Sequence, residues 1–330
     1  MSLYTNPPSG PPIPEQAAVG DIVFMGTPDF AVASLDALIN AGCNIVAVVT
    51  APDRPAGRGM QVNESAIKKY AVEKSLPGLR ILQPEKLKSP VFLEELKSLH
   101  ADLQVVVAFR MLPEVVWNMP PLGTINVHAS LLPQYRGAAP INWAIINGEK
   151  ETGVTTFKLQ QEIDTGNILL QEKISIGENE TAGELHDRLK ILGASVLVKT
   201  IRGIEEGNIF EQPQLTIHNA QPTIKHAPKI FTETCRIDWN NKADNIFNLI
   251  RGLSPYPTSF TYLHDKMLKI YFGKKEISEH HFANGSFYTD GKTYLKFACA
   301  DGFIHCTDIQ LQGKKRMGVE DFLRGFRMPV

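Results

Sequence analysis

Three polar side chains are of types that can polarise a carbonyl and move a proton, and two of them close one apolar segment. Asn126 and His128 flank Val127 at the end of Thr124–His128, a segment with the pattern of a buried strand. Side chains alternate along a strand, so Asn126 and His128 point to one face. An amide donor beside an imidazole can polarise a carbonyl while a proton moves. The alternative is structural, with Asn126 a strand-end hydrogen bonder and His128 a satisfied core histidine.

The third polar group lies in Gln161–Gly166, a polar loop between two extended segments. Asp164 in this loop could reach His128, hold its tautomer and stabilise the imidazolium. The alternative is an aspartate that closes an Asx turn, and sequence spacing does not choose between the two. Directly after His128, the run Ser130-Leu131-Leu132-Pro133 predicts an apolar wall or a rigid turn.

A basic loop, Pro52–Gly59, follows another expected strand and carries Arg54 and Arg58. Arginines on a Gly- and Pro-punctuated loop suit a phosphate or a nucleic-acid backbone. Two arginines in a loop are, however, commonly only solvated. The loop is expected at the same carboxyl edge of the sheet as Asn126 and His128, where α/β folds bind their ligands.

The elements that position these residues alternate between strand and helix from Asp21 onward. This alternation predicts an α/β fold with a Rossmann-like open, mostly parallel sheet covered by helices on both faces. GTPDF replaces the GxGxxG of dinucleotide-binding proteins after the first strand. We expect strands at 21–25, 44–50, 103–109 and 124–128, extended segments at 154–160 and 168–176, and helices near 30–40, 65–74, 90–99, 138–147 and 182–206.

Four parts of the chain follow from the composition along it. Residues 1–20 are Pro-rich and unpatterned, which indicates a flexible leader rather than a signal or transit peptide. Residues 21–206 form the first domain, and 207–222 form a polar linker. Short alternating segments and turn pairs over 223–330 predict a second, smaller β-barrel (OB-like) domain with one helix near 243–251.

Composition excludes the disordered, fibrous, membrane and disulfide-scaffold classes of protein. The chain has 330 residues, is 43% hydrophobic and carries a net charge of −1, and it contains no apolar run long enough to span a membrane. Its four cysteines form no CxxC pair, so a reducing cytoplasmic setting is expected. Residues up to Pro213 hold 18 basic and 24 acidic side chains, whereas the remainder has a net charge of +5. That asymmetry indicates an anionic partner for the second domain, unless it is chance.

The motifs together resemble the folate-dependent formyltransferases, and the wider match is to the methionyl-tRNA formyltransferase family. The resemblance runs from about Asp21 to about Arg324. It rests on GTPDF, PDRPAGRG, the NVHASLLPQYRG segment with GAAPIN, the DTG of Asp164–Gly166, ETGV at Glu151–Val154, RIDW at Arg236–Trp239 and QGKKRM at Gln312–Met317.

The resemblance implies a donor, an acceptor and roles for particular residues. The donor would be 10-formyltetrahydrofolate, and the acceptor would be the α-amino group of methionyl initiator tRNA. The catalytic set would be Asn126, His128 and Asp164. Ser130, Leu131, Leu132 and Pro133 would lie against the folate, while Arg58 and Lys229 would contact the tRNA. We expect a monomer. We also expect no metal, because no cluster of His, Cys or carboxylates has the spacing of metal ligands.

One departure from the family pattern is visible at Ala108–Pro113, which is a residue shorter than the usual AYGxxLP and is expected to border the folate pocket. The rival functions are sibling formyltransferases or hydrolases that act on an amino-sugar nucleotide or on formyltetrahydrofolate itself. These siblings are not expected to carry the PDRPAGRG loop. A non-catalytic tRNA-binding protein is disfavoured by the intact Asn126, His128 and Asp164.

Overall fold

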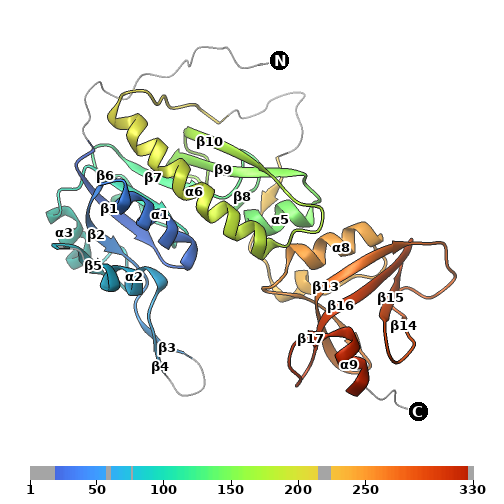
Figure 1. The fold of residues 1–330 in the computed structure, drawn as a ribbon. Helices are drawn as coiled ribbons and strands as arrows, with labels where there is room; N and C mark the ends of the chain where they lie inside the picture. The colour runs from blue at the N-terminus through green and yellow to red at the C-terminus, as the bar shows by residue number, and fades with distance from the viewer. Residues whose placement is uncertain (1–18, 57–60, 76, 215–223, 326–330) are drawn as a thin grey trace. The chain divides into compact units, whose positions relative to one another are not determined.

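The computed structural model describes residues 19–56, 61–75, 77–214 and 224–325 (Figure 1). Residues 1–18 of the expected leader, the tip of the basic loop with Arg58, and residues 215–222 of the expected linker lie outside this range. By its internal contacts the chain divides into two compact units. The first comprises Met1–Arg136, Gly153–Ile174 and Asp187–Lys225, and the second comprises Gly137–Thr152, Ser175–His186 and His226–Val330.

A seven-stranded sheet forms the first unit, in the order β10-β9-β7-β6-β1-β2-β5. The pairs from β7 through β5 are parallel, whereas β7 and β9 are antiparallel. The expected open, mostly parallel sheet is therefore confirmed. Its strands are β1 (Asp21–Gly26), β2 (Asn44–Val49), β5 (Arg80–Leu82), β6 (Leu103–Val107), β7 (Thr124–His128), β9 (Glu151–Lys158) and β10 (Ile168–Ser175).

Helices cover both faces of this sheet (Figure 1). Apolar residues of α3 pack on the face that carries Val23, Met25 and Val106. The opposite face meets α1 at Gly26 and α6 at Gly193, which lies against Val127. The helices with at least part of their length in this unit are α1 (Asp29–Asn40), α2 (Ala66–Lys74), α3 (Pro90–Ser98), α4 (Glu114–Trp117) and α6 (Ala182–Glu205).

The sequence pattern did not predict two pairs of short strands. The basic loop is a hairpin of β3 (Arg54–Ala56) and β4 (Gln61–Asn63), in which Arg54 pairs with Asn63. A further two-stranded pair joins β8 (Arg136–Gly137) to β11 (His226–Ala227). Segments of three residues or fewer are too short to show a period, which explains why they escaped the sequence analysis.

The second unit contains an antiparallel sheet that forms a half-barrel, which confirms the expected smaller β domain. The sheet order is β12-β13-β16-β15-β14, and β17 pairs with β16. The sequence pattern predicts a short strand at 268–272, and the structure extends it to β13, which continues through register shifts between Ile270 and Gly273. The elements are α5 (Pro140–Ile146), α7 (Thr232–Cys235), α8 (Ala243–Gly252), β12 (Ser259–Leu263), β13 (Lys266–Ile277), β14 (Phe287–Thr289), β15 (Leu295–Cys299), β16 (Gly302–Leu311), β17 (Met317–Gly318) and α9 (Val319–Gly325).

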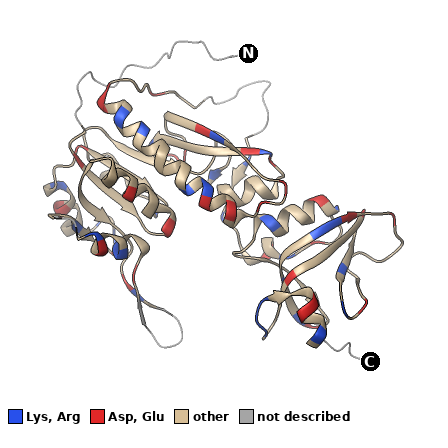
Figure 2. Cartoon of the chain, viewed as in Figure 1, with Lys and Arg blue, Asp and Glu red and all other residues tan. Residues whose placement is uncertain are grey.

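The core of the half-barrel is closed by α8, whose Ile246, Phe247 and Ile250 pack with residues of β13, β15 and β16. Basic and acidic side chains are interspersed on α8, β13 and α9 (Figure 2). Among the described helices of the whole chain, none is both long and apolar enough to cross a membrane.

Candidate active site

Asn126 and His128 lie where the register predicted, at the carboxyl end of β7. Val106 pairs with Asn126 and Val107 with Val127 across the parallel β6–β7 ladder. Because Val127 faces α6, Asn126 and His128 face the other side of the sheet, which also carries Val106. The side chain of Asn126 is half-buried and makes no hydrogen bond to any described residue. Its amide is therefore free to bind a ligand oxygen.

His128 is buried, with 7% of its surface exposed. Its Nε2 lies 2.9 Å from the carbonyl oxygen of Tyr135. A carbonyl only accepts hydrogen bonds, so Nε2 carries a proton and donates it. The ring also meets the edge of Phe157 in a T-shaped contact. The neutral imidazole consequently has its lone pair on Nδ1.

Asp164 lies beside that lone pair, as the resemblance implied. Its Oδ2 is 3.8 Å from Nδ1 of His128, and its side chain is 14% exposed. That distance is within ion-pairing range but too long for a hydrogen bond. When His128 gains a second proton, the carboxylate stabilises the resulting charge. The geometry therefore brings together all three residues of the expected catalytic set on one side of the sheet edge.

The backbone of the Asp164 loop is held by contacts that the sequence did not reveal. Asp164 adopts a φ of 54°, a left-handed conformation that aspartate tolerates better than most residues. A Cβ at Gly166 would come within 1.6 Å of the Lys158 carbonyl, so only glycine fits there. Gln214 donates from Nε2 to the carbonyls of Asp164 and Gly166, at 2.9 and 2.8 Å.

Gln214 also connects this loop to Arg136 in the segment after β7. The guanidinium of Arg136 donates from Nε and Nη2 to Oε1 of Gln214, at 3.1 and 2.6 Å. Burial lowers the pKa of Arg136, although the negative charges of Asp164 and Glu162 oppose that shift. Arg136 and Gln214 together therefore fix the loop that presents Asp164.

The Ser130–Pro133 turn is tied to β9 and β10 through one buried hydroxyl. Thr155 donates from Oγ1 to the carbonyl of Ser130 at 2.6 Å, and accepts from the Leu132 amide at 3.1 Å and from Gln171 Nε2 at 2.8 Å. Its one donor and two acceptor positions are therefore all used. The Ser130 hydroxyl itself donates to the Gln134 carbonyl. Leu131 and Pro133 are both half-buried, and the side chain of Leu131 lies against Gly153.

We expect Thr155→Val to destabilise the protein by about 1–3 kcal/mol, because it leaves the buried Leu132 amide without its acceptor. Thr155→Ser keeps the hydroxyl and should lose clearly less. Urea unfolding followed by circular dichroism measures both. Equal stabilities of Thr155→Val and the unmodified protein would contradict the role assigned to this hydroxyl.

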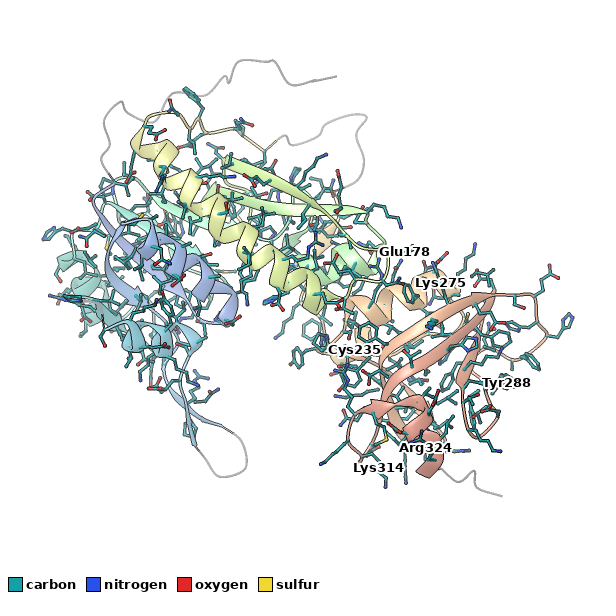
Figure 3. The ribbon with its side chains drawn as sticks, in the orientation of Figure 1. Glu178, Cys235, Lys275, Tyr288, Lys314 and Arg324 are labelled. Carbon is teal, nitrogen blue, oxygen red and sulfur yellow. The ribbon has the colours of Figure 1, made fainter. Side chains whose placement is uncertain are left out.

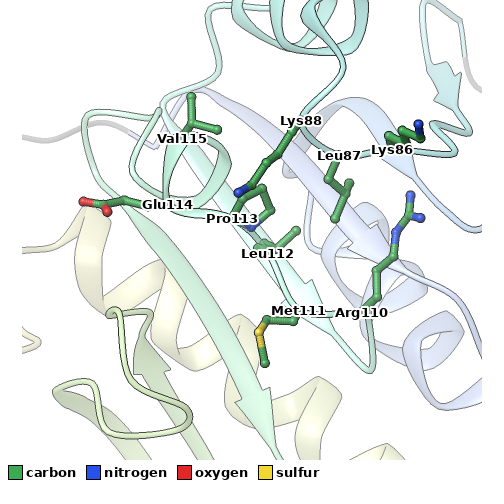
Figure 4. Close-up of a pocket in the computed structure, with 9 residues that line it drawn as sticks. All are labelled: Lys86, Leu87, Lys88, Arg110, Met111, Leu112, Pro113, Glu114 and Val115. Carbon is green, nitrogen blue, oxygen red and sulfur yellow. The ribbon is translucent and has the colours of Figure 1, made fainter.

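A pocket of about 990 Å³ opens at the same sheet edge (Figure 4). Its lining includes Arg110–Val115, a segment that starts three residues after β6, the parallel neighbour of β7. Leu112 also belongs to the core on the sheet face that Asn126 and His128 share. Arg110 donates to the Pro84 and Glu85 carbonyls. Part of the Ala108–Pro113 segment therefore lines a cavity with an apolar floor, the cationic side chains Lys86, Lys88 and Arg110, and the carboxylate of Glu114.

The structure describes only one of the two expected tRNA contacts. Arg58 lies outside the described residues. Lys229 precedes α7, and its ammonium lies 5.5 Å from the ring centroid of Phe231, which is exposed. Other basic side chains of the second unit include Lys275 on β13, Lys314 between β16 and β17, and Arg324 on α9 (Figure 3).

The fold and the residues at the end of β7 agree with one class of protein. Residues 21–201 match the family described as formyl transferase, and residues 229–327 match the family described as formyl transferase, C-terminal domain. These two matches cover most of the chain, so the class is that of the formyl transferases.

Curated relatives narrow the class further. The chain is 53% identical over 312 residues to the methionyl-tRNA formyltransferase of Parabacteroides distasonis, covering 93% of this chain and 95% of the relative. It is 51% identical over 308 residues to that of Flavobacterium johnsoniae, covering 92% of this chain and 95% of the relative. The chain belongs to the methionyl-tRNA formyltransferase family.

Solved structures show the same fold at low sequence identity. An N-formyltransferase from Helicobacter canadensis, in complex with folinic acid and dTDP-3-aminofucose, is 21% identical with a TM-score of 0.64, covering 86% of this chain and 98% of that chain. HypX from Aquifex aeolicus, in complex with tetrahydrofolic acid, is 16% identical with a TM-score of 0.61, covering 93% of this chain and 48% of that chain.

Proposed function

We propose that this protein transfers the formyl group of 10-formyltetrahydrofolate to the α-amino group of methionyl initiator tRNA. The observation that carries the proposal is the grouping of Asn126, His128 and Asp164 at one strand end, in a chain about 50% identical to curated methionyl-tRNA formyltransferases. The product, N-formylmethionyl-tRNA, serves translation initiation, so we place the protein in the cytoplasm.

In this proposal the neutral amine attacks the formyl carbon, a new C–N bond forms, and the carbonyl oxygen becomes an oxyanion. Asn126 donates a hydrogen bond to that oxyanion. The Nδ1 lone pair of His128 takes a proton from the attacking amine, and Asp164 stabilises the imidazolium that results. The bond to N10 of the folate then breaks, and N10 receives a proton as tetrahydrofolate leaves.

We assign the folate to the turn after β7 and to the neighbouring pocket. Leu131 and Pro133 are the half-buried members of the Ser130–Pro133 turn, and the pocket beside Arg110 lies on the same sheet edge. Its apolar floor suits an aromatic ring system, and its lysines and arginine suit the carboxylates of a glutamyl tail.

For the tRNA, we propose contacts from the basic hairpin through Arg58 and from the second domain through Lys229. The net charge of +5 after Pro213 supports this assignment, because the preceding part is net negative and would repel a polyanion. In this division residues 21–206 carry the chemistry and 223–330 hold the tRNA. The protein acts as a monomer, which light scattering tests directly.

The deciding experiment follows labelled formyl from 10-formyltetrahydrofolate into acid-precipitable methionyl-tRNA. We expect transfer to methionyl initiator tRNA, and no transfer to a UDP-linked amino sugar at the same concentration. Uncharged initiator tRNA is the matched control, because it has every phosphate contact but no amine. Transfer to the amino sugar alone, or release of free formate without transfer, would assign the protein to one of the sibling activities.

A further inference from the structure

One lysine of α2 holds both ends of the β3–β4 hairpin. Asp53 directly precedes β3, and Glu64 directly follows β4. The ammonium of Lys68 is hydrogen-bonded to Asp53 and lies 2.9 Å from the carboxylate of Glu64. A single cation on one helix therefore ties together the two positions at which the chain enters and leaves the hairpin.

Other contacts make the base of the hairpin a defined structure. Gln83 donates from Nε2 to Oδ1 of Asp53 and to the Ala51 carbonyl, both at 2.8 Å. Ser65 caps α2 by accepting from the Lys68 amide, and it also accepts from the Thr50 hydroxyl at 2.7 Å. The bonds from Lys68 and then Gln83 lower the pKa of Asp53, so this carboxylate stays charged well into the acid range.

The contribution of these contacts is local rather than global. The side chains of Lys68 and Asp53 are 20% and 26% exposed, and ion pairs of this kind add little to the stability of a whole domain. Without Lys68, however, two carboxylates would remain at the mouth of a two-stranded hairpin. An isolated two-stranded hairpin is only marginally stable, so the order of β3 and β4 depends on the contacts that Lys68 and Gln83 make at its base.

The orientation of the hairpin matters because its first residue is basic and lies near the pocket. Burial lowers the pKa of Arg110, and the positive charge of Arg54 lowers it further. The contacts agree, because Arg54 directly follows Asp53, which accepts from Gln83, and the adjacent Pro84 carbonyl accepts from Arg110 of the pocket lining. A change in the direction of the hairpin would move this cation, and with it the positive charge offered to an anionic substrate.

We propose that Lys68 is a positioning residue for the acceptor substrate: by holding Asp53 and Glu64 it fixes the direction of the β3–β4 hairpin, and thereby its presentation to the phosphates of tRNA. The inference rests on the proposed function for its substrate. The two contacts of Lys68 with Asp53 and Glu64, which we call the staple, are a property of the free protein.

The test is Lys68→Met, which keeps the length of the side chain and removes the charge. In the free protein, we expect exchange of the backbone amides of Arg54, Ala56 and residues 61–63 to become about 3- to 10-fold faster, the range for losing two partly exposed ion pairs. The KM for methionyl-tRNA should rise by a similar factor, while the affinity for a folate analogue and the melting temperature stay unchanged. Lys68→Arg should restore both quantities, and Lys69→Met, an exposed lysine on the same helix, is the matched control.

The two readouts separate the possible failures. Unchanged amide exchange in Lys68→Met would overturn the staple. Faster exchange with an unchanged KM for methionyl-tRNA would overturn its role in substrate positioning. If the unmodified protein fails to formylate methionyl-tRNA, the proposed function is wrong, and the exchange measurement still decides on the staple.

Discussion

Replacing His128 by glutamine is expected to lower kcat by about 10²- to 10⁴-fold, the range for loss of a general acid–base group. The glutamine amide can still donate to the Tyr135 carbonyl, which the imidazole Nε2 now contacts. It has no basic nitrogen to take the place of Nδ1 beside Asp164. Single-turnover transfer to methionyl-tRNA measures the effect without interference from product release.

The control for this variant is its affinity for a folate analogue, which should remain within severalfold of the unmodified protein. Asp164→Asn should lower the rate in the same direction, since it removes the negative charge 3.8 Å from Nδ1. If His128→Gln transfers formyl at a rate close to that of the unmodified protein, the role of His128 is structural only. It would then be a buried histidine whose function is to donate a hydrogen bond to a carbonyl.

Replacing Asn126 by alanine is expected to lower kcat by about 10²- to 10³-fold, because one donor to the developing oxyanion is lost. Its amide is half-buried and makes no hydrogen bond to a described residue, so the loss should leave the folded protein intact. Rapid-quench measurement of formyl transfer gives the rate, and thermal unfolding gives the stability.

Asn126→Asp is the informative companion, because it has nearly the same shape but offers a carboxylate in place of a donor. It should be at least as slow as Asn126→Ala, since a negative charge would face the oxyanion. Activity of Asn126→Asp near that of the unmodified protein would show that shape alone, and not hydrogen-bond donation, is required at this position.

The parts of the fold that follow local rules could be predicted from sequence. The strand Thr124–His128 has the expected bounds, and α2 (Ala66–Lys74) lies where a helix near 65–74 was expected. Asn126 and His128 share a face because the period of a strand is two. Asp164 lies near His128 as the family resemblance implied, although spacing alone had left an Asx turn equally open.

The supporting contacts could not be predicted, because they join residues far apart in the chain. Gln214, just before the undescribed part of the expected linker, bonds to the backbone of Asp164, 50 positions earlier. Thr155 reaches Ser130 across 25 positions. Nothing in the local sequence of a threonine or a glutamine distinguishes such a partner from an ordinary strand or loop residue.

The pairing of α5 with α8 has a consequence for how the protein is made. Asn142 of α5 donates from Nδ2 to the carbonyl of Gly252 at the end of α8, 110 positions later, and a Cβ on Gly252 would collide with Ile146. A ribosome adds about 5–20 residues per second, so α5 emerges roughly 5–20 seconds before its partner exists. During that interval the apolar side chain of Ile146 lacks its native cover. The nascent chain at this stage is therefore a natural client for chaperones that shield apolar surface during synthesis.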